Sequence, residues 1–500
     1  MTEGVGRSSA PPAHRTGVLN VLRALRDDGP QDRIPAVLEE HYLEAWFGFA
    51  PHELRSVLNA APDPEVHRRP LVAYTRSLLR GEAVPPMADA RQSDLKALSS
   101  AARGTVIAIG VLEARLGGEF DSAMQLVNRA AADAPVSNAL VDGSLGIASF
   151  TFLQAGITRM LAGDLGRALA DFERVKWTVP PADLAFLVRD AHAKAALVHA
   201  MFGDPELVHR ELAEAQRVPR TQSWAEVLVD ATAKLATLIA DGSEAAFTQL
   251  LSLPRQEIGE MWPLFVLSLA PAVLAGRSGA ERLLVALENA PLPGSTTGQG
   301  MTGSASAVVR AAQAASAGRL SEARAVLASA DPELVVTRLV QAGLALDGGM
   351  PSQALALALR TAEQTGGLRQ LELWRLGVLH LAHRALGEDA AADAALEQAR
   401  RCAEGLSRVN LPISGASRAL VEAVLRDETS PAPAAATLSL TPRELEVLAH
   451  LAAGVSRRGI AERLFVSVNT IKSQVSSLYR KLDAADRDEM LAEAYRRGLI

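Results

Sequence analysis

Residues 467–482 of the sequence read SVNTIKSQVSSLYRKL. In an α-helix, where each residue advances about 100°, four apolar side chains of this stretch fall on one stripe: Ile471, Val475, Leu478 and Leu482. The opposite face carries small, amide or cationic side chains: Asn469, Lys472, Ser473, Ser476 and Arg480. Because the stretch contains no carboxylate, this face can closely approach a polyanion.

The residues before this stretch predict two shorter helices. Thr441 and Glu444 have the spacing of a capping box, in which each side chain bonds the other residue's amide at a helix start. Gly454 is expected to end that helix in a left-handed conformation, and Ser456 to cap the next one. After a tight turn at residues 465–467 the third helix follows, so the pattern predicts a helix-turn-helix whose second element enters the major groove of DNA.

Residues 438–482, LSLTPRELEVLAHLAAGVSRRGIAERLFVSVNTIKSQVSSLYRKL, resemble the DNA-binding domain of LuxR-type transcriptional regulators. The resemblance continues to residue 500 through that family's fourth helix, and it implies that residues 456–475 are the DNA-binding motif. The implied contacts are Lys472, Ser473 and Ser476 to bases, and Asn469, Thr470, Arg480 and Lys481 to phosphates. It also implies that DNA-bound copies pair through the last helix, around residues 487–497.

The match departs from the family at two positions. Gly459 stands where the family usually has Glu, and a glycine costs about 1 kcal/mol against a good helix former. Gln474 replaces the usual His of the recognition helix. Neither change removes the fold, but both mean that the operator sequence must be found for this chain itself. For Lys472, Arg480 and Lys481 the alternative reading is an ordinary solvated helix face, which the motif in register disfavours.

The charges are unevenly distributed along the chain. With 500 residues the chain is too long for a single core, so two or more units are expected. The net charge is −6, but residues 438–500 carry 10 basic and 8 acidic side chains, which leaves −8 for the remainder. The acidic bulk would not favour DNA, whereas the C-terminal part can bind it.

Cysteine content and hydropathy predict a cytoplasmic protein. Cys402 is the only cysteine, so neither an intrachain disulfide nor a multi-cysteine zinc site can form. The N-terminus lacks the apolar core of a signal peptide. The strongest apolar run, residues 261–275, is short for a membrane span and contains Pro263 and Pro271. It is therefore expected to form a buried helix pair, with no membrane as partner.

Residues 17–426 are rich in Ala and Leu and are punctuated by glycines. The glycines recur at intervals of about 40 residues: Gly81, Gly118, Gly163, Gly203, Gly242, Gly279, Gly318, Gly349 and Gly387. This period predicts an all-α chain, an α-solenoid of stacked helical hairpins that resembles tetratricopeptide repeats, in which Ala168 and Ala323 allow close helix approach. The alternative is an irregular all-α domain with the same secondary structure but no superhelix.

Residues 34–82 look like the start of the helical-repeat region in the large MalT-like members of the LuxR group. In those proteins an ATP-binding module precedes the repeats. The present sequence has no Gly-x-x-x-x-Gly-Lys-Ser/Thr motif, so no cradle for a triphosphate is evident and no cofactor is expected. The chain therefore resembles a MalT-like regulator reduced to repeats and DNA-binding domain.

Two segments are predicted to separate folded units. Residues 291–306 are rich in Gly, Ser and Thr and are expected to be a flexible break between two stacks of repeats. A phosphate loop is disfavoured there because the segment has no lysine. Residues 427–437 form the second linker, which Pro431 and Pro433 stiffen. Residues 1–16 are expected to be a disordered tail.

The sequence offers weak candidates for other sites. His380 and His383 are spaced to share a helix face, but without a nearby Cys or placed carboxylate, repeat packing is favoured over a metal site. No catalytic set is evident, so an enzyme is not expected. An aromatic cluster stands near the N-terminus: Tyr42, Trp46, Phe47 and Phe49. It is either a partner patch or the seal at the end of the solenoid, and the second is favoured.

Taken together, the sequence predicts a cytoplasmic, sequence-specific regulator of transcription that binds double-stranded DNA as a homodimer. Residues 438–500 would form a four-helix LuxR-type domain, and the repeats would sense an effector or dock a partner of unknown identity. The competing hypothesis is a helical-repeat interaction protein that uses its C-terminal domain mainly for pairing.

Overall fold

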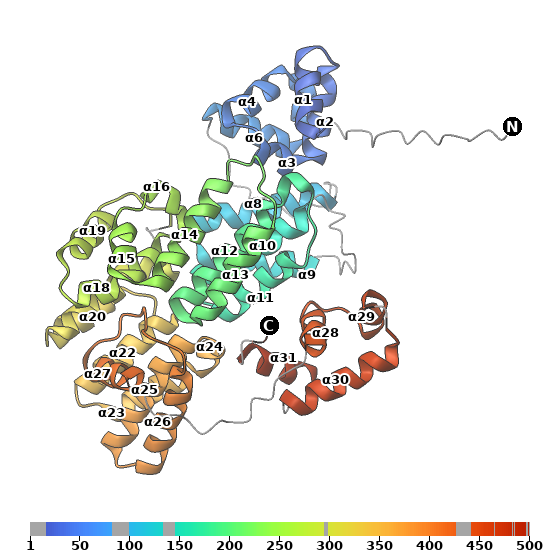
Figure 1. The fold of residues 1–500 in the computed structure, drawn as a ribbon. Helices are drawn as coiled ribbons and strands as arrows, with labels where there is room; N and C mark the ends of the chain where they lie inside the picture. The colour runs from blue at the N-terminus through green and yellow to red at the C-terminus, as the bar shows by residue number, and fades with distance from the viewer. Residues whose placement is uncertain are drawn as a thin grey trace.

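The structure, a computed structural model, describes residues 17–82, 100–133, 146–294, 299–426, 442–464, 466–482, 484, 486–496 and 499. All regular elements in these ranges are helices, which confirms the predicted all-α class (Figure 1). The predicted tail at residues 1–16 and linker at 427–437 lie outside the described residues.

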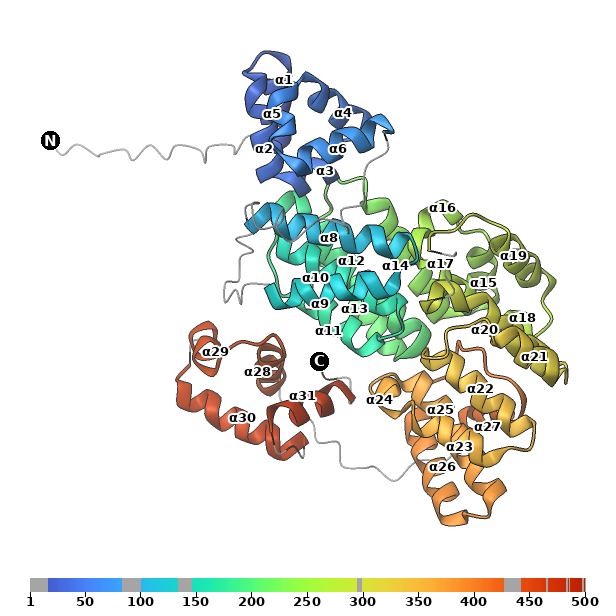
Figure 2. The same ribbon diagram turned by 180° about the vertical axis from the view of Figure 1, so that it is seen from behind.

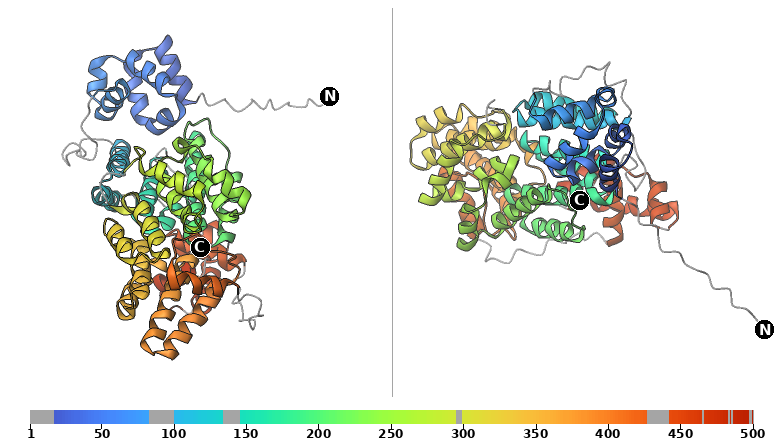
Figure 3. Two further views of the ribbon diagram at one scale, coloured as in Figure 1. Left: turned by 90° about the vertical axis from the view of Figure 1, so that its left-hand side faces the viewer. Right: turned by 90° about the horizontal axis from the view of Figure 1, so that it is seen from above.

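The first helices form a unit at one end of the molecule, seen apart from the rest in Figure 3. They are α1 (Val18–Asp27), η1 (Gln31–Arg33), α2 (Ile34–Glu40), α3 (Tyr42–Gly48), α4 (Pro51–Ala60), α5 (Asp63–His67) and α6 (Pro70–Arg80). Leu22, Ile34 and Leu58 are completely buried among them. These side chains belong to the same continuous cluster of buried apolar residues as those of the helices that follow.

The predicted aromatic patch lies at the base of this unit and is largely closed. Tyr42, Phe47 and Phe49 are buried and Trp46 is half-buried. The Phe47 ring lies 4.8 Å from that of Phe186, and the indole N–H of Trp224 donates to the backbone carbonyl of Trp46 at 2.9 Å. Phe47 and Trp46 thus pack the first unit against the helices that follow, because Phe47 finds aromatic neighbours there.

A first stack of helical hairpins follows. Its helices are α8 (Ser100–Leu116), α9 (Phe120–Asp133), α10 (Ile147–Leu161), α11 (Leu165–Lys176), η3 (Ala182–Leu184), α12 (Phe186–Phe202), α13 (Pro205–Arg217), α14 (Glu226–Asp241) and α15 (Glu244–Leu251). Within each hairpin the two helices contact each other, and α8, α10, α12 and α14 contact one another in turn. Ala168 of α11 is fully buried, as its small size allows close approach.

The second stack continues the chain. It contains α16 (Arg255–Ile258), η4 (Gly259–Met261), α17 (Trp262–Ser268), α18 (Ala270–Leu274), α19 (Ser278–Glu288), α20 (Gly300–Ser316), α21 (Leu320–Leu327), α22 (Val335–Asp347), α23 (Pro351–Leu359), α24 (Ala362–Thr365), α25 (Arg369–Leu386), α26 (Asp389–Ala403) and α27 (Gly415–Arg426). Here α20, α22 and α25 contact one another in turn, and α27 packs on α25 and α22.

Most of the recurring glycines end helices, as their spacing suggests. Seven of the nine have positive φ, among them Gly387. The backbone N–H of Gly387 and that of Glu388 donate to carbonyls in the last turn of α25. Gly203 and Gly279 differ. Gly203 has φ −109°, and Gly279 lies inside α19, where Gly276 (φ 70°) makes the turn instead.

The apolar run at residues 261–275 is interior. Residues 255–274 together are long and apolar enough to cross a membrane, but 67% of the apolar window is buried inside the protein. The run divides into α17 and α18, with Pro263 and Pro271 in their first turns, where a missing N–H costs little. The predicted buried helix pair is therefore confirmed.

The predicted flexible break at residues 291–306 is wrong in its second half. Residues 295–298 lie outside the described residues, but α20 begins at Gly300 and buries Met301, Ser304 and Ala305. Asp331 accepts from the amide of Gly300 at 2.9 Å, and its own amide donates to Ser304 Oγ at 2.8 Å. Small residues permit a helix here because tertiary packing and these bonds override their low helix propensity.

The two stacks bend so that they meet (Figures 1 and 2). Helix α12 contacts α25, and α10 contacts α20. Arg369 pairs with Asp204 at 2.6 Å, and Gln370 donates to the carbonyl of Ala200 at 3.0 Å. These bonds join residues more than 160 positions apart, so they link the two stacks directly. The buried apolar side chains of both stacks form one largely continuous core.

The C-terminal helices have a separate core. They are α28 (Pro442–Ala452), α29 (Arg457–Arg463), α30 (Val468–Leu482) and α31 (Arg487–Arg496). Their buried apolar side chains are Val447, Leu448, Leu451, Ile460, Ala461, Ile471, Val475, Leu478, Leu482, Met490 and Ala494. In Figures 1 and 2 these four helices stand beside the first stack, and we refer to them below as the reader domain.

Candidate DNA-binding domain and its contact with the repeats

The helix ends of the reader domain follow the predicted caps. Gly454 has φ 77° directly after α28. The Oγ of Ser456 accepts from the amide of Gly459 at 3.2 Å and starts α29. Thr441 of the predicted capping box lies outside the described residues, while its partner Glu444 is buried and accepts from Ser477 Oγ at 2.8 Å. The Glu444 carboxylate thus also ties the first helix to the third.

Helix α30 is oriented by its apolar stripe. Ile471, Val475, Leu478 and Leu482 are all buried, as their spacing predicts. Lys472, one position after Ile471, is exposed. The helix therefore buries one side in the reader core and presents a lysine to solvent, as a recognition helix requires.

The other predicted DNA contacts share this helix. Asn469, Thr470, Ser473, Ser476, Arg480 and Lys481 belong to α30, but their side chains lie outside what the structure describes. Phe465 of the tight turn also lies outside it. The DNA contacts of the six α30 residues remain predictions from the sequence.

Two arginines that the sequence analysis missed brace the reader domain. A guanidinium N–H of Arg443 donates to the carbonyl of Leu464 at 2.7 Å, where α29 ends. A guanidinium N–H of Arg487 donates to the carbonyl of Leu451 at 2.7 Å, where α28 ends. Both satisfy carbonyls that a helix C-terminus leaves without an intrahelical partner. Arg443 is the second residue of α28 and Arg487 the first of α31. Neither position carries a local sequence pattern that predicts this role.

The reader domain contacts the repeats through aromatic rings. The Trp177 indole, directly after α11, lies 5.4 Å from the His450 imidazole of α28, measured between ring centroids. His450 is buried, with no hydrogen-bond partner for Nδ1 among the described residues. Burial lowers the pKa of His450, and the guanidinium of Arg463 lowers it further. The neutral imidazole is therefore the form that fits this contact.

Helix α31 lies against the same part of the repeats. Burial raises the pKa of Tyr495 to about 12, and the charges of Glu173, Arg174 and Asp171 on α11 also act on it. The phenol of Tyr495 therefore lies within range of the charges on α11. Two helices of the reader domain, α28 and α31, thus meet the repeats at α11.

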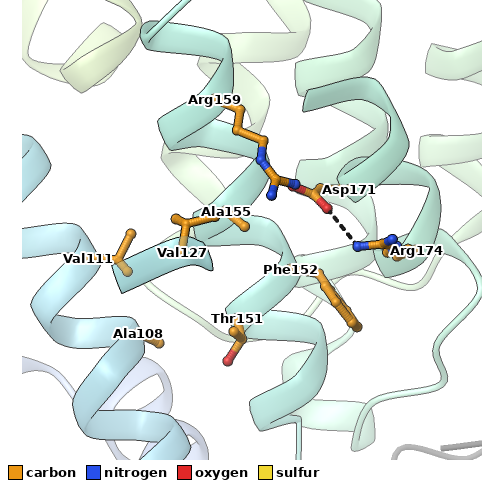
Figure 4. Close-up of a pocket in the computed structure, with 9 residues that line it drawn as sticks. All are labelled: Ala108, Val111, Val127, Thr151, Phe152, Ala155, Arg159, Asp171 and Arg174. Carbon is orange, nitrogen blue, oxygen red and sulfur yellow. Dashed lines mark hydrogen bonds and ion pairs between the residues drawn. The ribbon is translucent and has the colours of Figure 1, made fainter. Parts of the chain in front are cut away.

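Ion pairs fix the side chains of α11 on the side near the reader domain (Figure 4). Asp171 pairs with Arg159 of α10 and with Arg174, the latter at 3.2 Å. The Arg174 guanidinium also lies over the Phe152 ring, 5.4 Å from its centroid. The cavity beside these side chains holds only about 10 Å³, room for about one water. It is a braced surface and not a ligand site.

The contact leaves the recognition helix open. In Figures 1 and 2, α30 lies on the side of the reader domain away from α11. Lys472 is exposed in this arrangement. The residues that meet the repeats come instead from the end of α28 and from α31, the helix through which the LuxR resemblance implies pairing.

The histidine pair considered for a metal does not converge. Nδ1 of His380 lies 2.8 Å from the carbonyl of Ala392, and Nδ1 of His383 bonds the Glu388 carboxylate at 2.5 Å. Each ring is thus engaged in packing α25 against the turn and helix that follow. Within the described part of the chain, no cluster of three or more His, Cys, Asp or Glu side chains could hold a metal.

Comparison with known proteins concerns the reader domain. Residues 438–494 match the family described as "Bacterial regulatory proteins, luxR family". The chain is 39% identical to the transcriptional regulatory protein LiaR of Bacillus subtilis over 62 residues, which are 12% of this chain and 29% of LiaR. It is 45% identical to the "Probable transcriptional regulatory protein NarL" of Mycobacterium tuberculosis over 69 residues, 14% of this chain and 31% of that protein. The chain thus spans about three tenths of the length of these relatives.

Proposed function

We propose that this chain, whose residues 438–494 form a DNA-binding domain of the luxR family of bacterial regulatory proteins, is a cytoplasmic, sequence-specific transcriptional regulator. The observation that carries the proposal is α30, with its apolar stripe buried and Lys472 exposed on a helix without a carboxylate. An ammonium on this face can contact phosphates or the acceptors of guanine in the major groove.

The repeats are assigned the regulatory role. In this proposal the repeats bind an effector or a partner protein. In the absence of that effector or partner, α11 binds the reader domain. Support comes from the contact of Trp177 with His450 and from the charges of α11 that act on Tyr495. Since α31 is the helix that the family resemblance assigns to pairing, its contact with α11 competes with homodimer formation on a two-fold operator.

The contact energies suit a switch. An aromatic pair of this kind contributes about 0.5–1.5 kcal/mol beyond its buried area. An effector needs only a comparable difference in affinity between the held and released states to shift their populations. The proposed mechanism therefore asks for a modest coupling free energy, within the range of about 1–3 kcal/mol that is typical of allosteric proteins.

The deciding experiment is genome-wide DNA occupancy of the intact protein beside a Lys472→Ala, Arg480→Ala double variant. Discrete peaks that share a two-fold sequence and disappear in the variant would establish the regulator and supply its operator. Peaks that persist in the variant would contradict the assignment of α30. An absence of peaks across growth conditions, with folded protein present, would favour the competing function of a helical-repeat interaction protein.

A further inference from the structure

The last repeat helix borders a groove that none of the functions above uses. The groove has a volume of about 340 Å³ and lies between α18, residues 407–413 and α27. Its apolar walls are Pro271, Leu274, Leu411, Ile413, Val421 and Leu425. A space of this size is at the lower end of the range for small-molecule sites, about 300–1,000 Å³.

The polar part of the groove is strongly cationic. Arg408, Arg418 and Arg426 line it together with one carboxylate, Glu422. Glu422 is already engaged, because Nε of Arg418 donates to it at 2.7 Å. Arg426 is exposed and has no ion pair among the described residues. The groove therefore carries two more positive charges than negative ones.

Arg408 makes no ion pair among the described residues either, and it is less exposed than Arg426. Its side chain is half-buried, and a guanidinium N–H donates to the backbone carbonyl of Ile239, a neutral acceptor. Burial lowers the pKa of Arg408, and Asp241, the carboxylate that opposes this effect, makes no ion pair with it in the described structure. A partly desolvated guanidinium with only a carbonyl partner is stabilised by any anion that can reach it.

We propose that this groove binds a small organic anion that has a single carboxylate and an apolar body. The guanidinium of Arg408 would take the carboxylate through paired N–H donors, a geometry that suits arginine. The apolar body would lie along Leu274, Ile413 and Val421 and lose its contact with water. A neutral sugar or a nucleotide fits less well, since the first leaves the arginines without a counter-charge and the second would place a polar ribose and base against the apolar walls.

The position of the groove connects it to the reader domain. Helix α27 supplies Arg418, Val421 and Leu425, and it ends at Arg426, from which residues 427–441 lead to α28. A ligand that joins α18 to α27 would change the stability of the last helix before that linker. This coupling rests on the function proposed above, whereas binding to the groove does not.

The test is calorimetry on the full-length chain with octanoate as probe, matched against 1-octanol, which has the same tail without the charge. We expect saturable one-to-one binding of octanoate and binding of octanol weaker by about tenfold or more. Arg408→Leu should weaken the binding of octanoate by a similar factor. Arg426→Gln, at an exposed position where folding is not at risk, should weaken it by a smaller factor. Arg167→Gln, an exposed arginine of α11, is the control and should leave binding unchanged.

Three results would overturn the assignment: no saturable octanoate binding, equal binding of octanol, or full affinity in both groove variants. DNA binding of the same samples is measured separately by fluorescence anisotropy on the operator. Intact DNA binding without octanoate binding would reject the groove and leave the regulator standing. Octanoate binding by a protein that occupies no operator would support the groove and reject the regulator.

Discussion

The indole of Trp177 and the imidazole of His450 lie 5.4 Å apart, although 273 positions separate them in the sequence. One ring belongs to the repeats and the other to the DNA-binding domain. Two units with separate cores touch at this pair, and α30 lies on the far side of the reader domain.

Trp177→Ala should release the reader domain. Loss of the ring pair should shift the balance between held and released states by roughly two- to tenfold, because such a pair contributes about 0.5–1.5 kcal/mol. The measurement is the radius of gyration by small-angle X-ray scattering, which should increase. Val179→Ala, an exposed side chain two positions further on, is the matched control. An unchanged radius would show that Trp177 does not hold the reader.

The held state should weaken in acid through His450. Its pKa lies below 6.5 because of burial and the guanidinium groups of Arg463 and Arg443, which outweigh the opposite effect of Glu446. The held state therefore binds fewer protons than the released one. The contribution of neutral His450 to the stability of the held state is fully present above about pH 6.5. It is progressively lost as the pH falls below that value.

Scattering between about pH 8 and pH 5.5 checks this pH dependence. The wild type should expand at the acidic end, whereas His450→Gln, which cannot be protonated there, should show a flatter profile. Equal expansion of both proteins would assign the pH dependence to groups other than His450.

Lys472→Ala should weaken operator binding by about five- to a hundredfold, since a charged groove contact contributes about 1–3 kcal/mol of discrimination. Fluorescence anisotropy with operator and scrambled duplexes measures both affinity and specificity. Lys234→Ala, which removes an exposed lysine from α14, controls for the change in net charge. Equal affinities of the Lys472 and Lys234 variants for the operator would remove Lys472 from the interface.

Arg480→Ala should weaken all duplexes alike, because a phosphate contact carries no sequence information. The slope of log affinity against log salt should become shallower by about one. Titrations at several salt concentrations, on operator and on random DNA, give this slope. A loss confined to the operator would instead make Arg480 a base-reading residue.

Arg115→Ala should destabilise the repeats by about 3 kcal/mol, since it removes one partner of a buried ion pair. Arg115 is 1% exposed, pairs with Glu260 at 2.8 Å and donates to Thr158 Oγ at 2.9 Å, so it joins α8 to α10 and η4. Chemical denaturation followed by circular dichroism measures the loss. Arg167→Ala, at a side chain 75% exposed, should change stability by less than about 1 kcal/mol. Similar losses in both variants would contradict the structural role of Arg115.

Local patterns predicted the elements well where the causes are local. The stripe of α30, the cap at Ser456 and the left-handed Gly454 follow from helical periodicity and backbone conformation, which depend on residues within one or two turns. The same reasoning failed at Gly300, where α20 begins in a segment that looked like a flexible loop. Its reason is tertiary, since Asp331 lies 31 positions away.

The sequence by itself determined an all-α chain whose residues 438–494 match the luxR family, because hydrophobic period, caps and charge are encoded residue by residue. It could not place Trp177 against His450, close α12 onto α25, or bring Arg408 into a groove with Leu274. Only the tertiary structure decided these, because contacts between distant segments depend on how each turn orients its two helices, and small differences accumulate over many repeats.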